Sequence, residues 1–471
     1  MFGLGIGLSA LLVLCILCVC AFEFINGFHD TANAVATVIY TKSLKPWRAV
    51  VLSGILNGLG VFMGGTAVAM GIINLLPVET LVDQNVMHSL GMVGAILLTA
   101  IIWNLGTWLL AIPASSSHTL IGAILGVGIA YSLLPGTGDA AVNWHKASEV
   151  GLSLLCSPLF GSILAILLMA LLARIFLSNH QLFKAPKGDT PPPWWIRGVL
   201  IATCGLVSFS HGSNDGQKGI GLMMLVLIGI IPAKFALDER YGDQEIAQSL
   251  VQVQQTFEAA SSKLTDAKSQ GILQAASVPL AALNGLTSEM DDTIREGNHR
   301  FEIRKNILLL RNEVSKLKED SQNGIYSAEQ VESVQALVSD ATSLRRFTDY
   351  APFWVIVLIA LSLGIGTMIG WERIVVTIGE KIGKTHLTYA QGASAEIVAA
   401  STIAASTYLG LPVSTTHVLS SGIAGAMVSS GGLSNLDKAV IQKIVLAWVL
   451  TFPVCVTLSG TLFLVFRSVF S

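Results

Sequence analysis

Apolar segments long enough to cross a lipid bilayer recur along this sequence, and they restrict the chain to few fold classes. A membrane-spanning helix needs about 20 mostly apolar residues. Of the 471 residues, 52% are hydrophobic and only 12% are charged, with a net charge of −2. This composition excludes an ordinary soluble protein, and no basic stripe or recognition module indicates nucleic acid binding. We therefore predict an all-α polytopic membrane protein.

Two polar clusters interrupt the apolar segments. The first covers residues 23–37 and contains Asp30, and the second covers residues 209–221 and contains Asp215. A charged side chain at bilayer depth costs about 2.5–3.5 kcal/mol on insertion scales, so it needs a partner or a polar cavity. The structural alternative is a buried carboxylate that only bridges helices. Because both clusters keep the aspartate, we favour a functional site.

A second pair of motifs indicates that the sequence is internally duplicated. Residues 113–118 are Pro-Ala-Ser-Ser-Ser-His and residues 412–417 are Pro-Val-Ser-Thr-Thr-His, and Gly126 corresponds to Gly425. Each half thus has an aspartate cluster followed by a proline-led motif. The predicted organisation is a first membrane repeat at 1–178, an inter-repeat loop at 179–193, the start of a second repeat at 194–231, a charged helical extramembrane insert at 232–350, and the rest of the second repeat at 351–471.

We expect about ten spans, five in each repeat, with broken helices or re-entrant hairpins at the proline-led motifs. The apolar stretch 4–40 is too long for a straight helix within a bilayer core of about 30 Å. Glycine beside a polar cluster lets a membrane helix unwind and present its backbone to a cavity. We therefore expect this helix to break near Gly27.

Basic residues predict that the two repeats have inverted topology. If the loop with Lys42, Lys45 and Arg48 is cytoplasmic, five crossings place the second repeat in the opposite orientation. The short outside loops then hold only Lys146, with Arg467 at the C-terminal edge, as the positive-inside rule predicts. Both termini are expected on the non-cytoplasmic side. Inverted repeats with broken helices are typical of secondary transporters, whose substrates bind where the repeats meet.

The insert at 232–350 does not belong in lipid, because it contains 13 of the 28 Lys and Arg and 18 of the 30 Asp and Glu. Apolar residues at helical spacing predict amphipathic helices in a hairpin or small bundle. These residues are Ile246, Leu250, Val253, Phe257, Ile303, Ile307, Leu310, Val314 and Leu317. The side of the membrane stays open, as does the choice between a solvated cap, a homodimer contact and a regulatory sensor.

The two Ser/Thr triplets are suited to bind an oxyanion. Their members are Ser115, Ser116, Ser117, Ser414, Thr415 and Thr416. Such a run after proline is typical of the first turn of a helix, where hydroxyls, free N–H groups and the helix dipole all favour an anion. Two such turns facing each other would surround a tetrahedral oxyanion. The alternative is that these side chains only pack or bond across helices.

Other polar residues of the clusters suit cations or protons. Asp30 and Asp215 would bind coupling cations or accept the proton of a protonated oxyanion. His29 is a candidate proton site, because histidine titrates near neutrality, or else a hydrogen-bonded structural residue. The amides that would add neutral ligands are Asn26, Asn33 and Asn214.

His118 and His417 occupy matching positions, so we expect a shared role in capping, gating or proton transfer. Ser117 and His118 do not form a nucleophile–base pair, because adjacent helix residues point about 100° apart and no third member is evident. We predict that the chain is not an enzyme. All six cysteines lie in apolar segments, and we assign no metal site and no cofactor to them.

In these motifs the sequence resembles the PiT family of inorganic phosphate transporters. The family's duplicated signature is Gly-Ala-Asn-Asp-Val-Ala-Asn-Ala together with Pro-x-Ser/Thr-Ser/Thr-Ser/Thr-His. Here its copies stand at 27–34 with 113–118 and at 212–219 with 412–417. Residues 209–222, and Trp-Asn-Leu-Gly-Thr-Trp at 103–108, look most like the bacterial low-affinity Pit proteins.

The resemblance implies symport of phosphate into the cytoplasm across the bacterial inner membrane. For the bacterial members it implies proton coupling and a neutral complex of phosphate with Mg²⁺ or Ca²⁺, whereas other branches use sodium. The residues that would touch phosphate are Asp30, Asp215, Ser115, Ser116, Ser414 and Thr415. Asn33 would help to hold a cation, and Glu396 matches an acidic position important in the family.

Three positions depart from the family pattern. His29 replaces the asparagine before Asp30, Lys218 replaces the second motif's asparagine, and Asn57 stands where sodium-coupled members often carry glutamate. A lysine at the place of a sodium ligand favours protons as the coupling ion. If Lys218 faces the cavity, it would instead neutralise Asp215 or attract the anion.

Three hypotheses follow for function. The leading one is a proton-coupled phosphate symporter, with or without a divalent cation in the transported complex. The second is a sodium–phosphate symporter. The third, from another class, is a phosphate-sensing receptor in which the insert at 232–350 is the output module.

Overall fold

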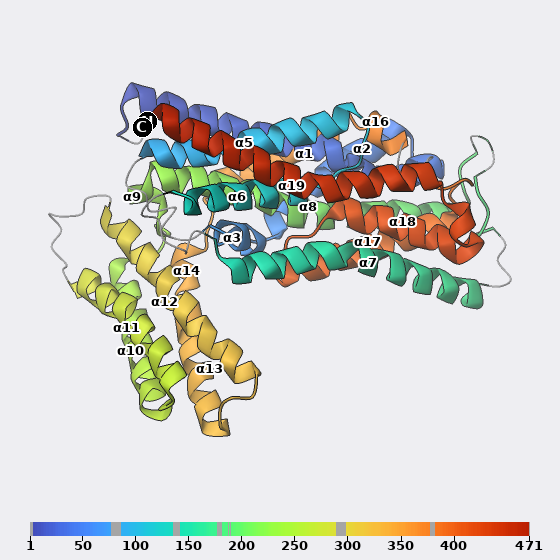
Figure 1. Ribbon diagram of the computed structural model, residues 1–471. Coiled ribbons are helices and arrows are strands. Elements are labelled where there is room, and N and C mark those ends of the chain that lie inside the picture. The colour runs from blue at the N-terminus through green and yellow to red at the C-terminus, as the bar shows by residue number, and fades with distance from the viewer. Residues whose placement is uncertain are drawn as a thin grey trace. The chain divides into compact units, whose positions relative to one another are not determined.

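The computed structural model describes residues 3–76, 86–134, 142–176, 181–186, 188, 190–288, 298–376 and 382–470. The regular secondary structure in these ranges is all helical (Figure 1). One isolated β-bridge joins Gly383 and Leu436. The chain divides into two compact units. The insert unit consists mainly of Leu227–Tyr350, and the membrane unit contains Leu4–Thr80, Met87–Val226 and Ala351–Ser471. The inter-repeat loop at 179–193 lies partly outside the described residues.

The membrane unit is built from long helices and a few short ones. They are α1 (Ile6–Tyr40), α2 (Pro46–Met63), α3 (Ala67–Ile73), α5 (Val86–Leu109), α6 (Ser116–Ser132), α7 (Trp144–Ile175), α8 (Trp194–Ile230, whose last residues belong to the insert unit), α15 (Phe353–Thr367), α16 (Glu372–Val376), α17 (Tyr389–Tyr408), α18 (Thr415–Gly431), the 3-10 helix Leu433–Asn435 and α19 (Lys438–Phe470).

Outward-facing apolar side chains give this unit the surface of a membrane protein. On α7, for example, Leu152, Leu155 and Leu159 are 63%, 70% and 60% exposed, and an apolar face of this kind needs a non-aqueous surrounding. Five helices in the described part of the chain are long and apolar enough to span a membrane, or six if one bent pair counts as one span. The chain therefore has the character of a multi-pass membrane protein. Ten spans and inverted repeats stay predictions.

The predicted break near Gly27 is wrong. α1 runs without interruption from Ile6 to Tyr40, as does α8 from Trp194 to Ile230. The glycine serves close helix packing instead of unwinding, because a Cβ atom at Gly27 would collide with backbone atoms of Leu363 and Thr367 in α15. Gly212 of α8 lies in the same way against the backbone of Asn57 in α2. Small residues at such crossings let membrane helices approach closely.

The chain breaks at the proline-led motifs, as predicted. α5 ends at Leu109 before α6 starts at Ser116, and α17 ends at Tyr408 before α18 starts at Thr415. Proline disfavours helical backbone in the residue before it and lacks an N–H donor. The turns match in detail, since Ala111 and Gly410, each two residues before its proline, have positive φ values of 54° and 68°.

Matched helices of the two halves also have matched partners. α6 packs against α19, and α18 packs against α7. At these contacts Gly126 faces Val456 and Ser459 of α19, while its counterpart Gly425 faces Ser162 of α7. Each half therefore places its proline-led helix against the last long helix of the other half, which agrees with an internal duplication.

We expect Gly27→Ala to destabilise the membrane unit by about 1–3 kcal/mol, because the added methyl must displace the α15 backbone. Thermal unfolding of the purified protein in detergent measures this loss. Gly106→Ala in α5 is the matched control, since a Cβ there meets nothing within 4 Å. Equal melting temperatures for the two variants would show that the α1–α15 contact is looser than described.

The insert unit is a helical bundle with its own core. It contains α9 (Pro232–Phe235), α10 (Asp243–Lys263), α11 (Ala267–Ser288), α12 (Asn298–Gln322), α13 (Ala328–Ser343) and α14 (Arg345–Thr348). The predicted amphipathic pattern is confirmed: of the nine residues named from the sequence, eight are buried in this core and Phe257 is partly buried against it.

Hydrogen bonds join the two chain segments where the insert begins and ends. The N–H of Asp238 donates to the carbonyl of Phe347 at 2.9 Å. The buried guanidinium of Arg304 donates to the carbonyls of Ala236 and Thr348 at 2.9 and 2.7 Å. The incoming and outgoing chains are therefore fixed to each other by α12.

Asp349 should make the insert unit sensitive to acid. Its carboxylate lies 2.7 Å from Arg345 and 3.5 Å from Arg311. Burial alone would raise the pKa of Asp349, but these two charges outweigh it and hold that pKa below its usual range. The resulting stability is present above the unfolded pKa of about 3.9 and is lost as pH falls through the folded value.

Hydrogen exchange of α12 and α14 in the intact protein, followed from neutral to acidic pH, measures this dependence. Asp349→Asn should exchange faster at neutral pH and lose this part of the acid sensitivity. An unchanged acid profile in the variant would assign the sensitivity to other groups.

Candidate anion and cation site

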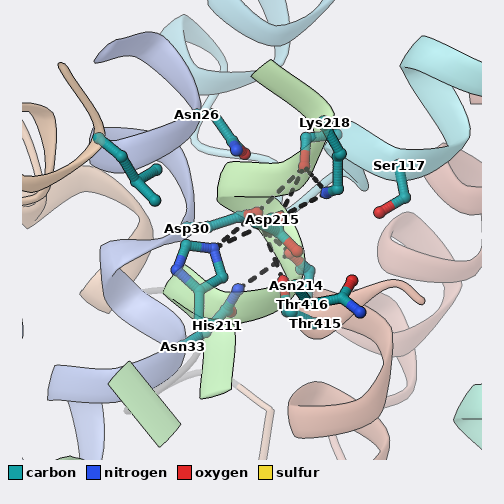
Figure 2. A network of polar contacts seen from close by, with 12 residues as sticks. Asn26, Asp30, Asn33, Ser117, His211, Asn214, Asp215, Lys218, Thr415 and Thr416 are labelled. Carbon is teal, nitrogen blue, oxygen red and sulfur yellow. Dashed lines mark hydrogen bonds and ion pairs between the residues drawn. The ribbon is translucent and has the colours of Figure 1, made fainter. Parts of the chain in front are cut away.

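The first turns of α6 and α18 meet two aspartates from α1 and α8 (Figure 2). Ser115 and Ser414 are the N-caps, and their hydroxyls accept from the backbone N–H groups of His118 and His417 at 3.2 and 3.1 Å. Both predicted helix starts are therefore confirmed. The N-termini of these two helices provide positive dipole ends close to the aspartates.

Asp30 accepts hydrogen bonds from both helix starts. Thr416 donates to Oδ1 at 2.7 Å, and Ser116 and Thr415 lie 3.2 and 3.5 Å from Oδ2. The residue is only 2% exposed. A carboxylate with this many donors is stabilised as a hydrogen-bond acceptor, although it lies inside an apolar helix bundle.

Asp215 is paired with a lysine that is also buried. The ammonium of Lys218, one turn later on α8, lies 2.5 Å from Oδ2 of Asp215 and 3.1 Å from the hydroxyl of Ser116. Ser116 is also 3.4 Å from that Oδ2, so one hydroxyl links the two carboxylates. Oδ1 of Asp215 has no hydrogen-bond partner among the described residues.

His211, for which the sequence predicted no role, lies between the two aspartates. Its Nε2 is 3.4 Å from Asp215 and 3.7 Å from Asp30, and its Nδ1 is 2.9 Å from Oδ1 of Asn57. One signal was available, because residues four apart on a helix share a face and His211 precedes Asp215 by four. Ligand atoms of Asp30, His211 and Asp215 lie within 4.8 Å of one another, a spacing that suits a metal ion.

Two further candidates are at the site. His29 joins Oδ1 of Asp30 to the hydroxyl of Thr107 in α5, at 3.2 Å on each side. Asn33 donates to Thr416 at 3.0 Å. The α1 cluster therefore reaches both the α18 start and α5.

Other candidates lie beside the site and make no described contact with the aspartates. Asn214 bonds to Thr407 and to the turn before α18, and Ser117 donates to the carbonyl of Val413 at 2.6 Å. Both therefore brace the proline-led turn of the second half. Asn26 donates to Glu23 at 3.4 Å, and Glu396 accepts from Thr203 of α8.

The two motif histidines meet each other. The rings of His118 and His417 are 4.5 Å apart, and His417 stacks on Trp448 of α19 at 3.9 Å. His118 also bonds to the N-cap Ser115 at 2.9 Å. This agrees with the capping role among the three alternatives and leaves gating and proton transfer as predictions.

Comparisons with known proteins agree with the motifs. The model of the family described as "Phosphate transporter family" matches residues 26–459. The chain is 42% identical to the low-affinity inorganic phosphate transporter PitA of Escherichia coli K12, over 98% of this chain and 97% of the relative. It is 28% identical to a probable low-affinity inorganic phosphate transporter of Bacillus subtilis, over 98% and 99%. A solved structure titled "The sodium-dependent phosphate transporter" has a similar fold, with a TM-score of 0.54 at 18% identity, over 98% of this chain and 100% of that one.

Proposed function

This chain belongs to the phosphate transporter family, and we propose that it is a secondary active symporter that imports inorganic phosphate together with protons. The family and the close relatives are transporters, which confirms that the chain is not an enzyme. The proposed location is the bacterial inner membrane, with the substrate bound between two inverted repeats and both termini on the non-cytoplasmic side. The phosphate-sensing receptor is set aside.

One observation carries this proposal: hydroxyls from two helix N-termini converge on the same carboxylate. Ser116, Thr415 and Thr416 all reach Asp30. The same hydroxyls, with free N–H groups of the first helical turns, would bind phosphate oxygens. Each hydroxyl has one proton to donate. Phosphate that takes these donors removes hydrogen bonds from Asp30, and the carboxylate then gains affinity for a proton or another cation.

Lys218 supports protons over sodium. It occupies the position that corresponds to Asn33 in the first motif, and its ammonium already neutralises Asp215. A sodium ion is not needed on that side of the site. On the other side, Thr416 donates to Asp30 at 2.7 Å and Asn33 donates to Thr416 at 3.0 Å, and these three side chains are the basis of the sodium alternative.

We also propose that a divalent cation travels with phosphate as part of the substrate. In a neutral complex the phosphate oxygens hold the cation, as substrate phosphates commonly do for Mg²⁺. Its charge would offset the repulsion between phosphate and the carboxylates of Asp30 and Asp215.

The test is phosphate uptake into proteoliposomes, with the pH gradient, sodium and divalent cations varied independently. Uptake should persist without sodium, fall when a proton uncoupler is added, and rise with Mg²⁺ or Ca²⁺. Uptake that requires sodium and resists the uncoupler would replace proton coupling by the sodium alternative.

A further inference from the structure

We propose that one face of α1 carries the coupled protons through the protein, with Glu23 as the proton-binding group on one side of the phosphate site and Glu396 on the other. This inference rests on the proposed proton symport. It assigns a role to Glu23 and connects Glu396 to the site.

The face consists of five polar residues of α1, whose other residues are mostly apolar. Glu23, Asn26, Asp30, Asn33 and Thr37 follow one another at intervals of three, four, three and four residues, and this spacing places them on one side of a helix. At 1.5 Å per residue they extend over about 21 Å. All five are buried, with at most 2% of their surface exposed. Figure 2 shows Asn26 and Asn33 on opposite sides of Asp30 along α1.

Oxygen atoms along this face lack donors. Among the described residues nothing donates to Glu23 Oε1, Asn26 Oδ1 or Asn33 Oδ1, and the hydroxyl of Thr37 makes no hydrogen bond. Buried polar atoms in proteins are nearly always hydrogen-bonded to protein or to ordered water. Four such atoms in a row before and after Asp30 therefore indicate a path suited to water and protons, since apolar side chains would pack there at lower cost.

Glu23 is the ionisable group at one end. Its carboxyl packs against Gly219, where a Cβ atom would collide with it, and no described cation lies within 4.0 Å. The charged or titratable groups that face it are Asp215, His211 and Lys218 of α8, and Cys20 one turn earlier on α1. A fully buried carboxyl without a directly bonded cation favours the protonated form.

Glu396 is the ionisable group beyond the other end. It is fully buried on α17, accepts from Thr203 and lies next to Thr37. Cys204 of α8 is the titratable group that faces it. Its Oε1 has no partner among the described residues. The path therefore has a carboxyl group beyond each end and Asp30 near its centre.

The transfer needs no reactant besides the proton. When phosphate takes the hydroxyls that donate to Asp30, the O–H bond of the Glu23 carboxyl breaks, an O–H bond forms on Asp30, and Glu23 takes a new proton from its own side. After phosphate leaves, the hydroxyls return to Asp30. Glu396 releases its proton to its own side, the O–H bond on Asp30 breaks, and an O–H bond forms on the Glu396 carboxylate.

The experiment compares Glu23→Gln with wild type in proteoliposomes by two readouts. The first is exchange of internal for external phosphate at equal pH, which needs the binding site and its movement but no net proton transfer. The second is accumulation of phosphate driven by an imposed pH gradient. We expect the variant to keep exchange and to lose accumulation by at least about tenfold, as for loss of a proton-transfer group. Glu396→Gln should behave in the same way.

Controls separate the other outcomes. Glu23→Asp keeps the carboxyl and should retain part of the accumulation, while Glu149→Gln, at an exposed pair with Lys146, should match wild type. Normal accumulation in Glu23→Gln would overturn the inference, and so would the loss of both readouts in a variant that reaches the membrane, because Glu23 would then be structural. If wild type itself ignores the pH gradient, proton symport fails first and this inference fails with it.

Discussion

Replacing Asp30 with asparagine is expected to lower phosphate uptake at least about a hundredfold while the protein still reaches the membrane. The carboxylate accepts from Ser116 and Thr416, and Asp215 lies one hydroxyl away. Asparagine has a similar shape but cannot hold the coupled proton, and its NH₂ group meets the donors of the two helix starts. The measurement is initial uptake of radiolabelled phosphate, normalised to the amount of protein in the membrane.

Asp437→Asn is the matched control, because Asp437 only caps α19 by accepting from the N–H groups of Ala439 and Val440. Asparagine is an equally good helix cap, so this variant should transport like wild type. Uptake at the wild-type rate in Asp30→Asn would remove Asp30 from the mechanism.

We expect Lys218→Met to lower the stability of the protein and to abolish phosphate uptake. The ammonium is fully buried on Asp215, and removing one member of a buried ion pair costs about 3–5 kcal/mol because the other charge is left without compensation. Thermal unfolding in detergent measures the loss, and phosphate uptake should disappear with it.

Double substitution separates stability from transport at this pair. Lys218→Met with Asp215→Asn should recover most of the stability, since no uncompensated charge remains, but it should not recover uptake. The control is Lys146→Met at the exposed, equally spaced pair with Glu149, which should cost at most about 1 kcal/mol. A Lys218→Met protein as stable as this control would mean that Asp215 is neutral without the lysine.

Much of the site could be predicted from the sequence, because its parts are short and duplicated. The proline-led triplets have strong local preferences, and they start α6 and α18 as expected. The aspartates are conspicuous in apolar segments. His211 was missed because a single histidine in a motif does not show which residues of another helix it will face. Asn214 and Ser117 were grouped with the site by sequence proximity, yet each turns toward the loop before α18.

The continuity of α1 could not be predicted from length and polarity. Glycine beside a polar cluster favours unwinding when nothing packs against it, whereas Gly27 allows the α15 backbone to approach. Whether the helix breaks or continues at Gly27 depends on tertiary contacts between residues more than 300 positions apart, which the local sequence does not encode. The insert is the opposite case, since its core follows directly from the spacing of residues such as Ile303 and Ile307.

The most direct test of proton coupling at the Asp30–Asp215 site is the internal pH of proteoliposomes when phosphate is added outside in sodium-free buffer. A pH-sensitive dye inside the vesicles reports protons while radiolabelled phosphate reports substrate. Wild-type vesicles should acidify as phosphate enters, and Asp30→Asn vesicles should show neither change. Phosphate entry without acidification, once corrected for the buffering and titration of phosphate itself, would contradict proton coupling at this site.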